Sequence, residues 1–111
     1  MADQEVALDQ VFGALSNETR RGMVIRLLRS PATVGELAAP LAMSLPAVMQ
    51  HLRVLQDCGL VTTSKSGRVR TCSIEADGLR LAEAWFAGQR AHWEHRLDRL
   101  GDVLGEPEPD G

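Results

Sequence analysis

The sequence predicts a mainly α-helical domain with a small β-hairpin, in the order α-α-α-α-β-β-α. Three observations predict it: apolar residues recur at helical spacing through most of the chain, two short helical segments meet at a tight break, and a segment rich in Val, Thr and Ile surrounds a glycine. The chain has 111 residues, and a typical domain has roughly 100 to 150. We expect one domain over residues 5–104, with flexible tails at 1–4 and 105–111.

Two amphipathic helices are predicted in the first part of the chain. Residues 5–15 carry apolar side chains at helical spacing, namely Leu8, Val11, Phe12 and Leu15. Ser16 offers an N-cap for a second helix over residues 17–29, whose apolar face carries Val24, Leu27 and Leu28. Ser30-Pro31 is expected to end this helix, because proline disfavours helical backbone in the residue before it.

Two further helices are expected to meet at the two-residue break Ala42-Met43. Thr33 and Glu36 have capping-box spacing, which predicts a short helix from Thr33 to about Leu41 that Pro40 helps to end. Ser44 then caps a fourth helix that accepts Pro46 in its first turn and ends at Cys58-Gly59. Its expected buried face carries Val48, Leu52 and Leu55.

A hairpin and a long helix complete the prediction. Residues 60–64 and 68–74 read as strands on either side of a turn at Lys65-Ser66-Gly67. From Asp77 to about Leu104 the pattern is helical again, with apolar residues three, four or seven positions apart: Leu79, Ala82, Phe86, Trp93, Leu97, Leu100 and Leu104.

The charges are unevenly distributed along a chain whose formal net charge is -3. Residues 1–18 carry four acidic and no basic side chains, residues 19–72 carry eight basic and two acidic ones, and residues 73–111 carry four basic and nine acidic ones. A basic middle between acidic flanks is typical of a small DNA-binding module, because only the phosphate-facing surface needs Lys and Arg. Ordinary variation of surface charge is the alternative.

Two helices across a short turn, followed by a hairpin with a basic tip, form the order of a winged helix-turn-helix. In such a module the second helix lies in the major groove of DNA. Here that helix is residues 44–58. We expect contacts to double-stranded DNA from Ser44, Pro46, Ala47, Gln50, His51 and Arg53 on the helix and from Lys65, Arg68 and Arg70 on the wing. Taken singly, each of these residues also fits plain solvated surface.

Four segments resemble the ArsR/SmtB-like bacterial transcription regulators, over roughly residues 5–104. They are Ala14-Leu-Ser-Asn-Glu-Thr-Arg-Arg-Gly-Met-Val24, Val34-Gly-Glu-Leu-Ala38, Ser44-Leu-Pro-Ala-Val-Met-Gln-His-Leu-Arg-Val-Leu55, and Gly59-Leu-Val61 with Gly67-Arg68. The resemblance implies a dimeric repressor that binds a palindromic operator. Met49 departs from the family, which commonly has a serine able to contact DNA at this position.

The last helix gives separate support for a homodimer. A helix of about 25 residues is roughly 37 Å long, which exceeds what the rest of so small a domain can cover. We expect a two-fold dimer built from the first and last helices, with an interface formed by Leu8, Val11, Phe12, Trp85, Phe86, Trp93, Leu97 and Leu100. The alternative is that Trp85 and Trp93 belong to the core of one chain.

The metal sites known in the resembled family are incomplete here, and no cofactor is expected. The third helix reads Leu37-Ala38-Ala39 where one site needs cysteines, and the last helix offers only His92 and His95, fewer ligands than zinc usually takes. Cys58 and Cys72 fit small apolar core positions. A metal- or thiol-redox-responsive repressor of the same fold, through His92 and His95 or through the two thiols, remains the alternative.

Other classes of protein are less consistent with the sequence. It contains no Ser/His/Asp order and no phosphate-binding glycine loop, so we do not expect an enzyme. A winged helix that binds protein instead of DNA would more naturally carry aromatic or aliphatic residues around Gln50 and Arg53. No apolar run approaches the roughly 18 residues needed to cross a bilayer, and the acidic start lacks the basic region of a signal peptide. We therefore expect a cytoplasmic protein.

Overall fold

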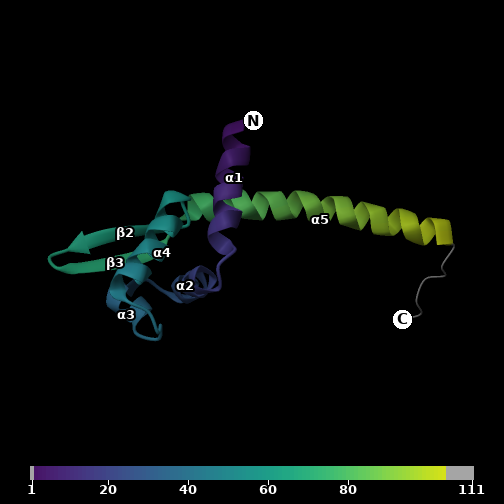
Figure 1. The fold of residues 1–111 in the computed structure, drawn as a ribbon. Coiled ribbons are helices and arrows are strands. Elements are labelled where there is room, and N and C mark those ends of the chain that lie inside the picture. Colours follow the sequence, from purple (N-terminus) through teal and green to yellow (C-terminus); the bar gives the residue numbers. More distant parts are fainter. Residues whose placement is uncertain (1, 105–111) are drawn as a thin grey trace.

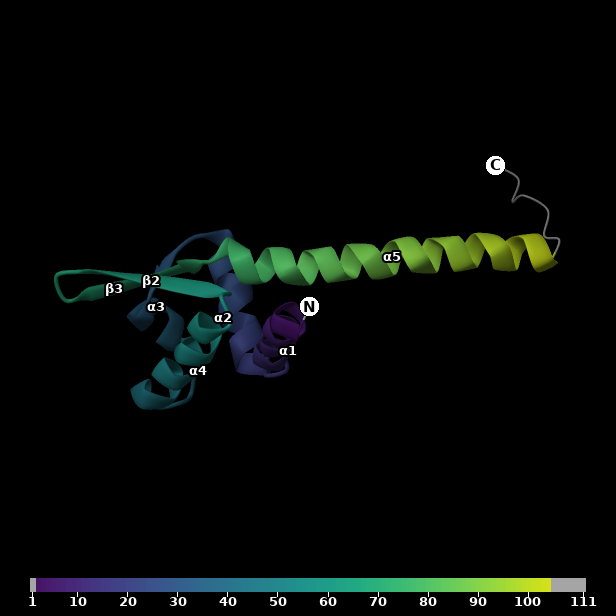
Figure 2. The ribbon, with the colours of Figure 1, turned by 90° about the horizontal axis from the view of Figure 1, so that it is seen from above.

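A computed structural model describes residues 2–104, so the tail expected at 105–111 lies outside the described residues. It confirms a mainly helical winged helix-turn-helix (Figure 1). Helix α1 (Ala2–Leu15) contacts the long helix α5 (Ala76–Leu104). Figure 1 and Figure 2 show that α1 crosses α5 close to the beginning of α5. The first helix begins earlier than expected, and residues 2–4 are helical because extending a formed helix adds a backbone hydrogen bond per residue at little cost.

Helix α2 (Glu18–Arg29) is capped by Asn17, so the expectation that Ser16 is the cap was wrong by one residue. The Asn17 side-chain oxygen accepts a hydrogen bond from the backbone N–H of Arg20 at 3.0 Å. The Ser16 hydroxyl instead donates to the Gly13 carbonyl at 2.6 Å. Ser16 thus satisfies a carbonyl at the end of α1, and Asn17 satisfies an N–H at the start of α2.

The helix-turn-helix consists of α3 (Val34–Ala38) and α4 (Leu45–Asp57). The capping box is confirmed: the Glu36 N–H donates to the Thr33 hydroxyl at 3.1 Å, and the Thr33 N–H donates to the Glu36 carboxylate at 2.8 Å. Helix α3 stops before Leu41, because Pro40 has no N–H for another helical hydrogen bond. Ser44 caps the start of α4 as predicted, and the Ala47 N–H donates to its hydroxyl. Cys58 is the C-cap, and it is followed by Gly59, whose φ of +80° suits glycine.

The sheet has three antiparallel strands in the order β1-β3-β2, where the sequence predicted only a hairpin. Strand β1 (Ala32–Thr33) pairs with β3 (Val69–Ile74), which also pairs with β2 (Val61–Ser66). Two residues are too few to show the alternation that identifies a strand in sequence. The predicted turn was also displaced: Lys65 and Ser66 belong to β2, and the chain turns at Gly67-Arg68, where Gly67 has a φ of +62°.

The core lies between α1, α2, α4 and the sheet, and most of α5 extends away from it (Figure 2). Every residue from Glu83 to Leu100 is exposed. The radius of gyration is 19.3 Å, whereas a compact chain of this length has about 13 Å. The far part of α5 is therefore unpacked in the single chain. Within residues 2–104, no helix combines the length and the apolar character that a membrane span requires.

Candidate nucleic-acid interface

Helix α4 is held in place by one fully buried face. Val48, Leu52 and Leu55 are at most 1% exposed and pack in the core, as predicted. Burying a side chain of this size contributes about 1.5–3 kcal/mol, which fixes the rotation of the helix about its axis. The opposite face is open and carries Pro46, Gln50 and Arg53, all exposed. Three of the predicted contact residues thus share one solvent-facing side of the helix.

His51 and Ala47 are half-buried and less accessible than the sequence suggested. The Nδ1 atom of His51 lies 3.2 Å from a guanidinium nitrogen of Arg20, and the Arg20 Nε donates to the Ala14 carbonyl at 2.7 Å. Arg20 therefore joins α4, the helix predicted to lie in the major groove and called here the recognition helix, to α2 and to the end of α1. His51 lies against α2, and its structural contact is one that helical periodicity does not reveal.

The wing consists of β2, β3 and their turn, and it exposes three cations. Arg68 is in the turn, and Lys65 pairs with Arg70 across the strands. Like charges directly opposite each other in a sheet destabilise it, and an anion beside them removes that cost. The side-chain amide of Gln56 in α4 donates to the Thr63 hydroxyl in β2 at 3.0 Å, which joins the wing to the recognition helix.

A hollow of about 370 Å³ connects the wing with the recognition helix. Met49 lines it from α4 and Arg68, Val69 and Arg70 line it from the wing, while the beginning of α3 closes it. Met49 also lines a second hollow with Pro46, Gln50 and Arg53. Met49 was not among the predicted contact residues, because its place in both hollows depends on how the wing packs beside α4, which the local sequence does not show.

Acidic groups are scarce near this surface. Glu36 and Asp57 are the only acidic residues between 19 and 72. The backbone and side-chain hydrogen bonds from Thr33 hold the pKa of the Glu36 carboxyl below its usual value, so it stays charged and bound in the capping box. Its contribution to stability is present above the ordinary carboxyl pKa and is lost as the pH falls through the lowered pKa.

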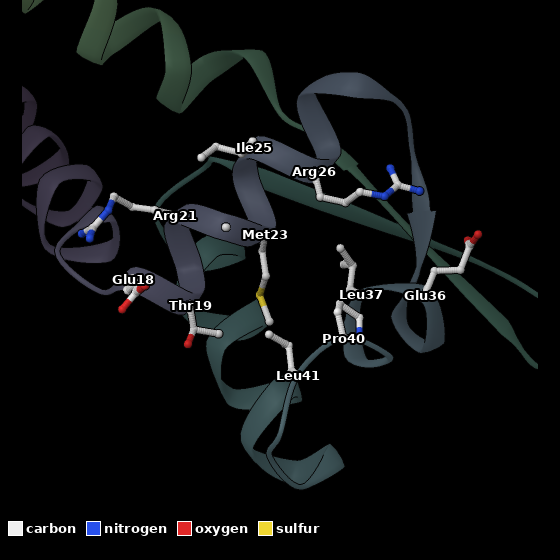
Figure 3. A pocket seen from close by; sticks show the side chains of 11 residues that line it. Glu18, Thr19, Arg21, Met23, Ile25, Arg26, Glu36, Leu37, Pro40 and Leu41 are labelled. Atoms are coloured by element: carbon white, nitrogen blue, oxygen red, sulfur yellow. The ribbon is translucent and has the colours of Figure 1, made fainter.

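A separate cavity of about 580 Å³ lies between α2 and α3 (Figure 3). Met23, Leu37 and Leu41 point toward one another in its interior. Two arginines and two glutamates also line it, namely Arg21, Arg26, Glu18 and Glu36, so their formal charges balance. None of the predicted DNA-contact residues lines this cavity, which separates it from the α4 face and the wing.

Large apolar side chains form an exposed stripe on α5. The stripe consists of Phe86, Trp93, Leu97 and Leu100, which are 53–58% exposed. Trp85 and Phe86 pack edge-to-face against Phe12 of α1, and their ring centroids lie 5.3 Å and 5.8 Å, respectively, from the centroid of the Phe12 ring. Of the other residues predicted for a dimer interface, Leu8 is half-buried and Val11 is fully buried in the core of its own chain. Val11 is therefore not available to a partner.

The two histidines of α5, His92 and His95, lie outside this stripe, and the thiols of Cys58 and Cys72 are half-buried and buried, respectively. At 3.6 residues per turn, His92 and His95 point to a different side of α5 from Trp93 and Leu97, and both are exposed. In the part of the chain that the structure describes, no three His, Cys, Asp or Glu side chains gather to hold a metal ion. Burial raises the pKa of both the Cys58 and the Cys72 thiol, which keeps them protonated at neutral pH.

Comparisons with known proteins match the helix-turn-helix region of the sequence and the fold of the chain. The sequence model described as "Bacterial regulatory protein, arsR family" matches residues 17–63, which include α3 and α4. The chain is 44% identical over 71 residues to the HTH-type transcriptional regulator Rv2034 of Mycobacterium tuberculosis, a match that covers 64% of this chain and 66% of that relative, just under two thirds.

Two solved structures are similar over most of their length. The crystal structure of the ArsR family transcriptional regulator RHA00566 has a TM-score of 0.75 and 48% identity, covering 81% of this chain and 93% of that one. The homodimeric winged helix-turn-helix DNA-binding domain of Mb0332 from Mycobacterium bovis has a TM-score of 0.66 and 25% identity, covering 85% and 88%. This chain belongs to the ArsR family of DNA-binding transcriptional regulators, which is not a family of enzymes.

Proposed function

We propose that this chain is a homodimeric repressor that binds a palindromic operator without sensing a metal ion. One observation supports the proposed DNA-binding surface: Met49 of the recognition helix lines the same hollow as Arg68 and Arg70 of the wing. The open face of α4 and the basic wing thus form one continuous surface. The helix in the major groove contacts base edges and so determines sequence preference. The cations of the wing bind the neighbouring phosphates and so position the protein on the duplex.

The exposed stripe of α5 supports the homodimer. More than half of each side chain in the stripe is exposed, and a stable chain rarely leaves so many large apolar groups in contiguous contact with water. A two-fold axis at α1 and α5 would present two recognition helices about one turn of DNA apart, roughly 34 Å. The homodimeric state given for the Mb0332 domain is consistent with this arrangement.

The proposal is tested by fluorescence anisotropy on DNA from the protein's own promoter and on a scrambled duplex. The titration is repeated over a salt series, with and without zinc and with and without reductant. We expect selective binding that neither addition changes. Binding that is equal on both duplexes contradicts the operator proposal. Release by zinc, or an affinity that differs with and without reductant, contradicts the proposed insensitivity to metal or thiol chemistry.

Arg68→Ala is expected to weaken binding to every duplex by a similar factor. Arg68 lies in the exposed turn of the wing, where a guanidinium binds phosphate without reading sequence. Loss of one phosphate contact lowers the slope of log K against log salt by about 1. Titrations of the wild type and the variant over the same salt series measure that slope, and an unchanged slope would remove Arg68 from the interface.

Gln50→Ala is expected to change the preference among operators instead. Gln50 is exposed at the centre of the open face of α4, and a glutamine amide can bind an adenine edge through two hydrogen bonds. Loss of such a pair reduces discrimination by about 1–3 kcal/mol at a single base pair. Binding to a set of single-base variants measures this effect, and a uniform loss across the set would exclude base reading by Gln50.

The two thiols of the folded protein are expected to react slowly with a disulfide reagent at pH 7–8. Burial raises the pKa of both groups, and only the thiolate attacks a disulfide. The reaction is followed by absorbance, with the chain unfolded in urea as the control. Reaction of Cys58 or Cys72 at the rate of the unfolded chain would contradict the structural role proposed for these residues.

A further inference from the structure

The proposed function uses the position of Met49 in the surface but gives its side chain no role in recognising the operator. Its side chain is half-buried and lines both the hollow beside the wing and the hollow beside Gln50 and Arg53. It therefore stands between the open face of α4 and the wing. A duplex held by both elements has to pass over Met49, so this side chain is desolvated when DNA binds.

Leu45 extends this apolar surface toward the start of the helix. It is 57% exposed and lies one helical turn before Met49, so the two side chains share a side of α4. Neither residue carries a polar group that can bind a phosphate or a polar base edge. The thymine 5-methyl group is the apolar feature that the major groove presents, and contact with it is a known way to recognise a T·A pair.

We infer that Met49 is a specificity-determining residue that reads a thymine 5-methyl group in the operator. This inference rests on the proposed operator binding, and it adds an apolar contact beside the polar readout by Gln50. Because Met49 and Gln50 are consecutive on α4, the thymine lies within about two base pairs of the position sensitive to Gln50→Ala.

The test uses deoxyuridine, which pairs like thymidine but lacks the 5-methyl group. A high-affinity duplex is first selected with the wild-type protein from a random pool, and each thymidine is then replaced singly by deoxyuridine. We expect one replacement per half-site to weaken wild-type binding by about four- to fifteenfold, the loss that corresponds to one or two buried methylene equivalents. For Met49→Ser the thymidine and deoxyuridine duplexes are expected to bind equally.

The salt dependence of the affinity distinguishes a methyl contact from the electrostatic contacts with phosphate. Burial of a methyl group releases no counterions, so the ratio of the two wild-type affinities is expected to stay constant over the salt series. Met49→Leu keeps an apolar side chain of similar size and is expected to retain a preference for thymidine. Val69→Ser is the matched control, because Val69 is 51% exposed in the same hollow and lies on the wing.

Three results would contradict the inference that Met49 reads a thymine methyl group. Equal wild-type binding to all singly replaced duplexes excludes a methyl contact while leaving operator binding intact. A preference that persists in Met49→Ser, or that disappears in Val69→Ser, assigns the contact to another residue. If the wild type selects no duplex from the pool, the proposed function fails and the methyl contact fails with it. Circular dichroism of each variant shows whether the chain is folded.

Discussion

Leu97→Glu is expected to convert the protein to a monomer and to weaken operator binding by about a hundredfold or more. Leu97 is 58% exposed within the apolar stripe of α5, so the single chain tolerates a charge there. In a two-fold dimer built on this stripe, both copies of the glutamate would be buried at the interface, close to each other. Burying two carboxylates without a partner cation is costly. Separating two half-site binders removes an effective-concentration gain of 10²–10⁴.

Sedimentation equilibrium and anisotropy on the selected operator measure the two effects. Ala91→Glu is the matched control, because Ala91 is exposed on the same helix but points away from Trp93 and Leu97. The control is expected to remain dimeric and to bind DNA like the wild type. A dimeric Leu97→Glu protein would show that the two chains meet through another surface.

Gly78→Ala is expected to destabilise the folded protein by about 1–3 kcal/mol, the usual cost of overpacking a close contact. Gly78 is in the first turns of α5, and its N–H donates to the Gly59 carbonyl, just beyond α4, at 2.9 Å. A Cβ atom on Gly78 would lie 2.6 Å from the Gly59 oxygen and 2.8 Å from its carbonyl carbon. Both neighbours are backbone atoms, so α5 has to move away from the end of α4.

Urea unfolding at a fixed protein concentration measures this change. Gly88→Ala is the control on the same helix, because a Cβ at Gly88 meets no atom within 4 Å. That substitution is expected to stabilise the protein by about 0.5–1 kcal/mol, because alanine loses less conformational freedom in a helix. Equal effects of the two substitutions would show that the Gly78–Gly59 contact does not limit how α5 packs on α4.

Local chemistry explains why much of the fold was predictable. The Thr33–Glu36 capping box, the Ser44 cap and the Gly59 end of α4 depend on residues within about four positions of each other. The buried face of α4 follows from helical periodicity in the same way. These signals placed the recognition helix, and with it Gln50 and Arg53 on its open side, before any tertiary contact was known.

The less accurate parts of the prediction depend on residues far apart in the chain. Strand β1 exists because Ala32 pairs with Cys72, and His51 turns toward α2 because it contacts Arg20. Val11 looked available for a dimer, but it is fully buried by the chain's own elements. A sequence pattern shows which face of a helix is apolar, and it does not show whether that face meets its own chain or a second one.

Local sequence was enough to predict the order of the helices and of the two hairpin strands, the helix-turn-helix and the basic character of the wing, because capping, turn formation and amphipathicity act between near neighbours. Tertiary packing set which predicted contact residues stay open, brought Met49 of α4 to the hollow beside the wing, and placed the beginning of α5 against Gly59 at the end of α4. Those features arise from packing between segments distant in sequence, where shape and available space select one arrangement among many that the same local preferences allow.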